Sequence, residues 1–364
     1  VRAPAFPPFM PMLTGHPFDL ACPAGALPSP QAAVDNGADC VYTGFKDNTN
    51  ARNFTGLNFD DAQLREGVRY AHTRGAKVFI ALNTYPQTST WGRWTAAVDK
   101  AADFGVDAII LADPGLMEYA RTKHPQLRLH LSVQGSATNY EAINFYHEQF
   151  GIQRAVLPRV LAMPQIEHVV NNTPVEIEVF GFGGLCVMVE GRCALSAYVT
   201  GDSPNTVGVC SPGKAVRYEQ TARGMETRLN GVLIDRFAEG EKTGYPTLCK
   251  GRFEVNDETY YAIEEPTSLN TLELLPKLME IGVKAIKIEG RQRSPAYVAQ
   301  VTKVWREAEL LPASGVSAES MKTMRTAPSL MPRVSAAMCA IVVSTPWPTS
   351  AVPMRTMART MSPF

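Results

Sequence analysis

Residues 77–111 read KVFIALNTYPQTSTWGRWTAAVDKAADFGVDAIIL, and this stretch decides the fold. Its two short apolar runs, Lys77–Leu82 and Ala108–Leu111, are rich in residues that favour β-strands. Between them, Arg93–Phe104 repeats its apolar residues at a helical spacing. A strand, a helix and a second strand in this order predict a βαβ unit, in which the two strands lie parallel.

The same alternation continues on both sides of that unit. Further helical patterns occupy Ser29–Asn36, Asp60–Arg74, Glu141–Phe150 and Leu269–Ile281. The remaining candidate strands are equally short and β-rich, and they are Phe18–Ala21, Cys40–Thr43, Leu129–Val133, Arg154–Leu157, Glu176–Phe180 and Ala285–Ile288. Eight such strands predict an α/β fold, a (β/α)8 TIM-like barrel, although an open doubly wound sheet fits the same alternation.

The chain divides into three zones by composition. Residues 18–309 carry all the periodic structure and form the predicted barrel domain. The last two strands lie roughly 100 residues apart, which is far more than an ordinary connection, so we expect an insertion over about residues 181–268. Residues 1–17 are Pro-rich and are predicted to be a disordered leader, and residues 310–364 are predicted to be a disordered or aberrant tail.

The overall charge limits the possible partners. Lys and Arg together number 35, as do Asp and Glu, so the chain has no global positive field to hold a nucleic acid. No apolar run reaches the ~20 residues of a membrane-spanning helix, and no signal peptide is recognisable. We therefore expect a soluble cytoplasmic protein with no nucleic-acid partner and no membrane-spanning segment.

Polar residues collect near the ends of several predicted strands. Glu176 and Glu178 alternate with apolar residues, as do Lys287 and Glu289, so these four side chains should point into the barrel. A further polar set lies at or just past other strand ends and comprises Asn83, Gln134 and Arg159. Barrels place their active sites at the carboxyl ends of the strands. The pattern fits a site there, and it fits structural polar groups in the barrel equally well.

Four cysteines fall in the predicted insertion, at Cys186, Cys193, Cys210 and Cys249, with the spacing C-x6-C-x16-C-x38-C and Gly or Pro close by. Four thiolates suit either zinc or an iron–sulfur cluster. The absence of close C-x2-4-C pairs favours the wider cluster, and four unligated cysteines remain the alternative. Cys22 and Cys40 are predicted to be buried thiols on early strands, while Cys339 lies in the tail.

A longer motif surrounds the first two cysteines. It reads Glu178-x-Phe180-x-x-Gly183-x-Leu185-Cys186-x4-Gly191-x-Cys193-x-Leu195-Ser196. This motif resembles the signature of the collagenase-like U-type peptidase family. Further matching stretches are Leu20–Gly25, Ala38–Gly44, Glu264–Asn270 and Lys287–Val298, so that the resemblance covers about residues 18–308. One departure is Gly184, where the signature has Ser or Ala.

Within that family the chain resembles the proteins of anaerobic ubiquinone biosynthesis. The resemblance implies a 4Fe–4S cluster on Cys186, Cys193, Cys210 and Cys249. It also implies a heterodimer with a homologous iron–sulfur subunit and a small lipid-binding accessory protein. The implied activity is O2-independent ring hydroxylation of a ubiquinone precursor, with a prephenate-like molecule as the oxygen donor. Arg291 and Arg293, just past the last strand, are candidates to hold a carboxylate donor, and the alternative is that they pair with nearby acids after a turn at Gly290.

Two other functions compete with ring hydroxylation. A peptidase is disfavoured because the sequence contains neither H-E-x-x-H nor G-x-S-x-G, and His147-Glu148 lacks a second histidine. The family resemblance also allows hydroxylation of RNA, which other members of the family carry out. The neutral net charge of this chain does not favour RNA as the substrate. The sequence itself identifies no catalytic residue.

Overall fold

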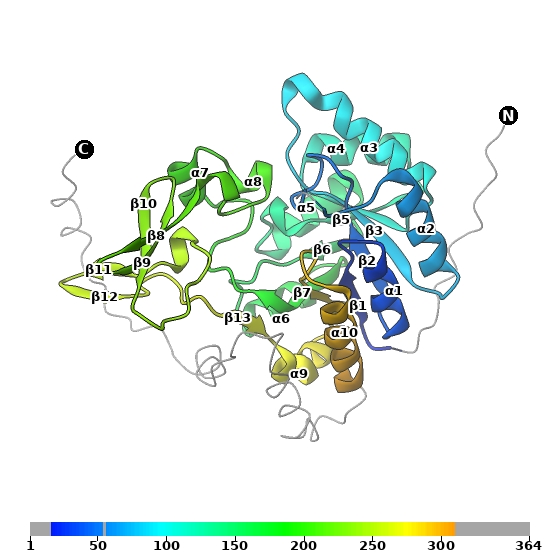
Figure 1. Cartoon of the computed structure of the whole chain (residues 1–364). Helices are drawn as coiled ribbons and strands as arrows, with labels where there is room; N and C mark the ends of the chain where they lie inside the picture. The colour runs from blue at the N-terminus through cyan, green and yellow to red at the C-terminus, as the bar shows by residue number, and fades with distance from the viewer. Residues whose placement is uncertain (1–15, 54–55, 310–364) are drawn as a thin grey trace.

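The computed structural model describes residues 16–53 and 56–309. Eight parallel strands form its centre (Figure 1), namely β1 (Asp19–Pro23), β2 (Cys40–Thr43), β3 (Lys77–Leu82), β4 (Ala108–Leu111), β5 (Arg128–Leu131), β6 (Arg154–Val156), β7 (Glu176–Gly184) and β14 (Ala285–Ile288). Strand β6 pairs with β7, β7 with β14, and β14 with β1, so the ring is closed. The predicted TIM-like barrel is confirmed, and the open doubly wound sheet is excluded.

Helices cover the outside of the ring, and they are α1 (Pro28–Asp35), α2 (Asp61–His72), α3 (Trp91–Asp103), α4 (Pro114–Lys123), α5 (Tyr140–Phe150), α6 (Met163–Asn171), α9 (Leu275–Glu280) and α10 (Pro295–Glu309). Helix α2 illustrates why they form. Asp60 and Gln63 make a reciprocal capping box at its start. Leu64, Val68 and Ala71 recur on one face of α2 and are buried against the barrel core. Throughout the described ranges, no helix combines the length and apolar character required to cross a bilayer.

A small lobe follows β7 and stands beside the barrel (Figure 1). Its elements are α7 (Leu195–Thr200), α8 (Pro204–Val207), β8 (Val216–Thr221), β9 (Gly224–Leu229), β10 (Val232–Phe237), β11 (Phe253–Val255) and β12 (Glu258–Tyr260). Strands β8, β9 and β10 form an antiparallel sheet over a small core of Ala215, Leu229 and Ile234. The lobe lies within the insertion predicted over residues 181–268. The predictions for residues 1–15 and 310–364, including Cys339, lie outside the described residues.

One predicted helix is partly wrong. The segment Leu269–Ile281 begins within a strand, β13 (Ser268–Asn270), and becomes α-helical only at Leu275. The cause is the length of β7, which continues past the barrel to Gly184 and leaves backbone groups without a partner in the ring. Strand β13 pairs antiparallel with Phe182–Gly184 and satisfies those groups. The apolar pattern of residues 269–281 cannot predict this strand, because the strand forms to pair with backbone groups of β7, a distant segment of the chain.

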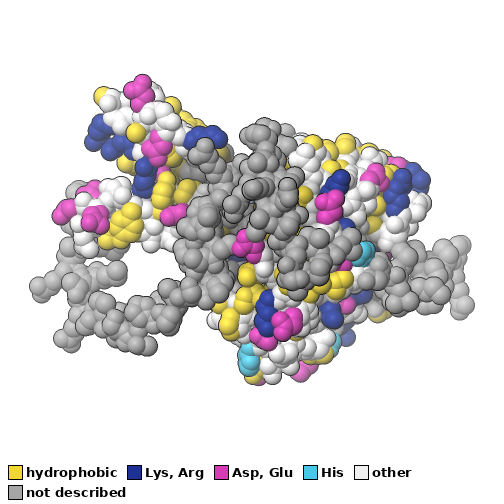
Figure 2. Space-filling model, turned by 90° about the horizontal axis from the view of Figure 1, so that it is seen from below, with side chains coloured by type: hydrophobic (Ala, Val, Ile, Leu, Met, Phe, Trp, Pro, Cys, Tyr) yellow, Lys and Arg dark blue, Asp and Glu magenta, His cyan; other side chains and the backbone are white. Residues whose placement is uncertain are grey.

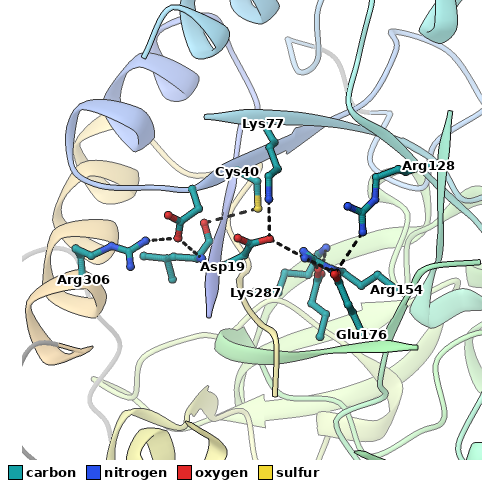
Figure 3. A network of polar contacts seen from close by, with 11 residues as sticks. Asp19, Cys40, Lys77, Arg128, Arg154, Glu176, Lys287 and Arg306 are labelled. Atoms are coloured by element: carbon teal, nitrogen blue, oxygen red, sulfur yellow. Dashed lines mark hydrogen bonds and ion pairs between the residues drawn. The ribbon is translucent and has the colours of Figure 1, made fainter. Parts of the chain in front are cut away.

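Charged side chains meet inside the ring (Figure 3). Arg154 of β6 has a side chain only 4% exposed and forms ion pairs with Asp19 at 2.6 Å, Glu176 at 2.8 Å and Glu178 at 3.5 Å. Lys287 of β14 donates to Glu178 at 2.6 Å. The predicted inward orientation of Glu178 and Lys287 is therefore confirmed. Glu176 is the first residue of β7 and reaches Arg154 from the amino-terminal end of the ring.

Candidate functional site

A cavity of about 290 Å³ opens at the carboxyl ends of the barrel strands. Its lining includes Asn83, Gln134, Arg159, Lys287 and Glu289, which lie at the ends of β3, β5, β6 and β14 or in the loops that follow them. These are the residues that the sequence placed at this end of the barrel. The predicted gathering of polar groups at the mouth is therefore confirmed, and we call this space the mouth cavity.

Glu289 is the anionic centre of the mouth cavity. Its carboxylate accepts hydrogen bonds from Arg159 at 2.9 Å, from Arg52 at 3.3 Å and from the Gly184 N–H at 2.9 Å. Burial acts to raise the pKa of Glu289, but the two guanidinium groups and the Gly184 N–H outweigh it and hold the pKa at about 2. Gly183 lies beside it with φ of +145°, which favours glycine, and a Cβ there would overlap the Glu289 side chain.

Arg159 ties the barrel to the loop that carries the first two cysteines. It pairs with Glu289, directly after β14, and also with Glu190, which lies between Cys186 and Cys193. Its guanidinium carbon lies 3.5 Å from the centroid of the Phe180 ring. The Arg159 side chain is only 7% exposed, so both ion pairs are shielded from water.

Arg291 is a buried cation without an acidic partner. It donates a hydrogen bond to the Asn50 side chain at 3.2 Å, and no carboxylate in the described part of the chain lies within ion-pair distance of it. Burial lowers the pKa of Arg291 to about 10, which still leaves it charged at neutral pH. Arg293 also lines the mouth cavity but is exposed. Of the two arginines proposed from sequence, Arg291 is the better placed to attract an anion.

A second cavity, of about 70 Å³, is lined by all four predicted cysteines, and we call it the cysteine cavity. Cys186 and Cys193 lie in the loop after β7, Cys210 follows α8, and Cys249 is in the 3-10 turn Leu248–Lys250. The structure thus brings together four residues spread over 64 positions of sequence. The other two described cysteines, Cys22 and Cys40, are buried in β1 and β2, as predicted.

Burial favours the protonated form of three of these thiols, those of Cys186, Cys210 and Cys249. Burial raises the pKa of Cys186 to about 12, and the nearby Glu190 carboxylate adds to the effect. Burial also raises the pKa of Cys249 to about 11 and raises that of Cys210. Reactive cysteine nucleophiles have lowered pKa values, so these thiols are unsuited to attack a peptide bond. A metal centre would displace their protons on binding.

The four cysteines share one space, but their arrangement does not match a site for a single metal ion. In the described residues, no three His, Cys, Asp or Glu side chains are arranged closely enough to hold one metal ion. The four cysteines instead border a common space. An iron–sulfur core separates its ligands more widely than a single zinc ion does, because it lies between them.

The mouth cavity and the cysteine cavity are neighbours. Gln134 and Glu190 line both of them. The Cys186–Cys193 loop is fastened to the barrel there, since Ser136 donates to the Glu190 carbonyl at 2.8 Å and Arg192 donates to the Ser136 carbonyl at 3.1 Å. Gly191 has φ of +91° at this contact, and a Cβ on it would overlap the Gln134 carbonyl.

We expect Gly191→Ala to loosen this contact and lower stability by more than a change of backbone preference alone. Gly201→Ala is the matched control, because Gly201 has φ of +76° and nothing lies within 4 Å of its missing Cβ. The control should lose about 1 kcal/mol through backbone strain, and Gly191→Ala about 2–4 kcal/mol through strain and overlap together. Urea denaturation under anaerobic conditions measures both. Equal losses would show that the Gln134 contact is unimportant.

Three residues of the site were missed from the sequence. Arg52 and Asn50 lie in the loop between β2 and α2, well past the strand end, and Glu190 lies in the cysteine loop. Arg52 donates to Glu289 and to the carbonyl of Gly208, two residues before Cys210. Strand ends can be located from periodicity, but the return of a loop to the cavity cannot. In the sequence, the only feature that could have indicated a role for Arg52 and Glu190 in the site is that each is a charged residue with small neighbours.

These features define a (β/α)8 barrel protein whose mouth adjoins a cysteine-lined cavity in an inserted lobe. The chain belongs to peptidase family U32, whose family model matches residues 25–333.

Curated relatives carry different names within this family. The tRNA hydroxylation protein P of Escherichia coli is 31% identical over 313 residues, which cover 80% of this chain and 67% of that protein. The tRNA hydroxylation protein P1 of Bacillus subtilis is 31% identical and is covered over 62% of its length, against 79% of this chain. A protein named collagenase from Porphyromonas gingivalis is 30% identical, with 80% of this chain and 65% of that protein covered. The chain thus spans about two thirds of the length of these relatives.

Proposed function

We propose that this chain binds a 4Fe–4S cluster through Cys186, Cys193, Cys210 and Cys249 and acts as a subunit of an O2-independent hydroxylase. The observation that carries the proposal is the cysteine cavity beside the mouth cavity, with Gln134 and Glu190 lining both. When bound, such a cluster supplies one-electron transfer. The residues of the barrel mouth then bind and orient the substrates next to it.

The proposed substrate is the ring of a ubiquinone precursor, because residues 18–308 resemble the proteins of anaerobic ubiquinone biosynthesis. Hydroxylation of tRNA is the second candidate, because curated relatives at 31% identity are named for it. The chain's neutral net charge favours the small molecule over the nucleic acid, since phosphate backbones are bound mainly by excess positive charge.

Proteolysis receives less support despite the family name. No histidine is among the residues that line either cavity, so neither holds a nucleophile–histidine pair. His147, which precedes a glutamate in the sequence, lies on α5 and bonds the Ile152 carbonyl. The raised pKa values of Cys186, Cys210 and Cys249 argue against a thiolate nucleophile as well.

The mouth cavity suits an anionic oxygen donor, such as a prephenate-like carboxylate. Five cationic side chains line it, namely Arg52, Arg159, Lys287, Arg291 and Arg293, against the two acids Glu190 and Glu289. Arg52 and Arg159 are already paired with those acids, and Lys287 with Glu178. Arg291 is therefore the cation that we propose to bind the carboxylate of the donor.

Replacing Arg291 should weaken the binding of a simple carboxylate. With benzoate as the probe in isothermal titration calorimetry, we expect Arg291→Gln to lose about tenfold to a hundredfold in affinity, as for loss of a buried hydrogen bond to a charged group. Arg293→Gln is the control, because its exposed charge is screened by water and should change affinity less than about threefold. Equal effects of the two substitutions would contradict the assignment to Arg291.

The proposed partners are a homologous iron–sulfur subunit, forming a heterodimer, and a lipid-binding accessory protein. The lobe supports a docking role through its exposed apolar side chains. Figure 2 shows hydrophobic side chains exposed on the face seen from below. The large exposed hydrophobic residues within the lobe are Val187, Tyr198, Val207, Tyr218, Val232, Leu233, Tyr245, Tyr260 and Ile263.

Deletion of the gene in its own organism separates the candidate functions. Ring hydroxylation predicts that quinone disappears in anaerobic cultures and persists in aerobic ones, with tRNA unchanged. Loss of a hydroxylated tRNA nucleoside with normal quinone would assign the tRNA function instead. Gelatin cleavage by the purified chain that survives replacement of the four cysteines would revive the peptidase.

A further inference from the structure

The carboxylate of Glu289 is joined to the surroundings of the cysteines as well as to the mouth cavity. It accepts a hydrogen bond from the Gly184 N–H at 2.9 Å, and Gly184 lies two residues before Cys186. Gly184 is the last residue of β7, so this contact fixes the point at which the chain leaves the barrel for the cysteines. Glu289 lines the mouth cavity but not the cysteine cavity, and it therefore acts on the cysteines through other groups.

Arg159 extends the connection to the middle of the Cys186–Cys193 loop. It donates a hydrogen bond to Glu289 at 2.9 Å and also pairs with Glu190, which lies within the loop. The donors of a guanidinium group lie in one plane at fixed positions. Arg159 therefore holds the carboxylate of the loop at a constant distance from the carboxylate that follows β14.

Arg52 makes a matching connection near the third cysteine. It donates a hydrogen bond to Glu289 at 3.3 Å and another to the Gly208 carbonyl, two residues before Cys210. Gly208 has φ of +74°, and a Cβ on it would overlap the Ala51 carbonyl. The backbone before Cys210 is thus packed directly against the loop of the barrel that carries Arg52.

The contacts around the fourth cysteine lie elsewhere in the lobe. The Cys249 carbonyl accepts a hydrogen bond from the Glu264 N–H at 3.1 Å. The next residue, Lys250, lies 3.8 Å from the Glu264 carboxylate and donates to the Thr267 carbonyl at 3.5 Å. Glu289 is therefore joined to segments beside three of the cysteines, and the segment around Cys249 serves as an internal control.

We propose that Glu289 is a positioning residue of the cysteine site. Through its two arginines it holds the Cys186–Cys193 loop and the segment before Cys210 at a fixed separation. Groups outside the ligand shell of a metal centre orient the ligands and determine how firmly the centre is held. A residue of the barrel mouth thereby controls retention of the centre between the cysteines. This inference rests on the cysteine site of the proposed function, but not on its substrate or its reaction.

Hydrogen exchange of the metal-free, full-length chain tests the connection, because it measures local opening segment by segment. Glu289→Gln keeps the shape of the side chain and removes its charge. In this variant, protected amides of residues 186–193 and 204–210 should exchange about tenfold or more faster, as for loss of a hydrogen bond to a charged group. Those of residues 246–252 should be unchanged. Equal acceleration of all three segments, or acceleration of none, would overturn the proposal.

Variants of the two arginines separate the two connections. Arg159→Gln should accelerate exchange of residues 186–193 and leave residues 204–210 nearly unchanged. Arg52→Gln should accelerate residues 204–210 and leave residues 186–193 nearly unchanged. Because each variant is measured separately, failure of one to fold leaves the other as a test. The same pattern of exchange in both variants would contradict two separate connections to Glu289.

Glu226→Gln is the matched control. Glu226 pairs with two arginines, Arg228 and Arg236, and its side chain is only 2% exposed. It lies on β9 in the lobe and lines neither cavity. Its replacement should leave exchange of residues 186–193 and 204–210 unchanged. If it accelerates them as much as Glu289→Gln does, general weakening of the lobe explains the effect and the positioning role is wrong.

Release of iron provides the second measurement. From protein purified without air, Glu289→Gln should lose iron to a ferrous chelator about tenfold or more faster than the wild type or Glu226→Gln, a typical effect of losing a group outside the ligand shell. Release from loaded Glu289→Gln at the wild-type rate would overturn the positioning role and leave the cluster intact. A wild type without iron would overturn the cluster, and the exchange pattern would still decide the role of Glu289.

Discussion

Alanine in place of any one of Cys186, Cys193, Cys210 or Cys249 should remove most of the iron and the brown colour from protein purified without air. Four thiolate ligands hold a cubane cluster, and loss of one opens a corner of the core to solvent. All four cysteines line one cavity, and neither of the other two described cysteines, Cys22 and Cys40, lines it, so the described residues offer no replacement thiolate there. Iron and sulfide analysis, together with absorbance at about 400 nm, measures the loss.

The matched control for this series is Cys22→Ala. Cys22 is buried in β1, its thiol lies 3.2 Å from the Thr302 hydroxyl, and it does not line the cysteine cavity. Burial raises the pKa of Cys22 to about 12, and its replacement should leave iron and colour unchanged. A colourless wild-type protein that contains stoichiometric zinc would contradict the cluster. Iron that persists in all four single variants would contradict the ligand assignment.

The barrel could be predicted because each strand is encoded locally. Cys40–Thr43, Lys77–Leu82 and Ala108–Leu111 have the same bounds in the sequence prediction and in the structure. Each is a short β-rich run whose burial depends on its own residues. Strand β13 was missed because it forms only to pair with the extension of β7, which no local pattern records.

The candidate site was predictable to the extent that its residues follow strands. Arg159, Lys287 and Glu289 come at or just after strand ends, and the closed ring places all such ends around one opening. Arg52 and Glu190 reach the same cavity from loops, and their positions depend on packing against Gly208 and Ser136.

Replacing Arg154 by Met should cause a large loss of stability. Arg154 is nearly fully buried and pairs with Asp19, Glu176 and Glu178 inside the barrel (Figure 3). Removing one partner of a buried ion pair leaves an uncompensated charge, which costs about 3–5 kcal/mol. Lys77 and Lys287 remain beside Asp19 and Glu178 and keep the loss within that range. Chemical denaturation of the anaerobically purified protein at neutral pH measures the change.

The pH dependence of this loss gives a second, independent check. Burial acts to raise the pKa of Asp19, but Arg154 and Lys77 outweigh it, so the pKa is lowered in the folded protein. A carboxyl group with a lowered pKa stabilises the fold above its unfolded pKa, about 3.9, and this contribution disappears as pH falls through the folded pKa. The difference between wild type and Arg154→Met should therefore shrink below about pH 4.

An exposed arginine separates the effect of burial from the effect of charge. Arg121 pairs with Glu118 on the surface of α4, where both side chains are about half exposed. Arg121→Met removes the same charge, yet it should cost less than about 1 kcal/mol, because water screens an exposed ion pair. Similar losses from Arg154→Met and Arg121→Met would mean that the charges inside the ring are solvated. In that case water would reach the interior of the barrel, and the Arg154–Glu178–Lys287 ion pairs would be accessible from the mouth cavity.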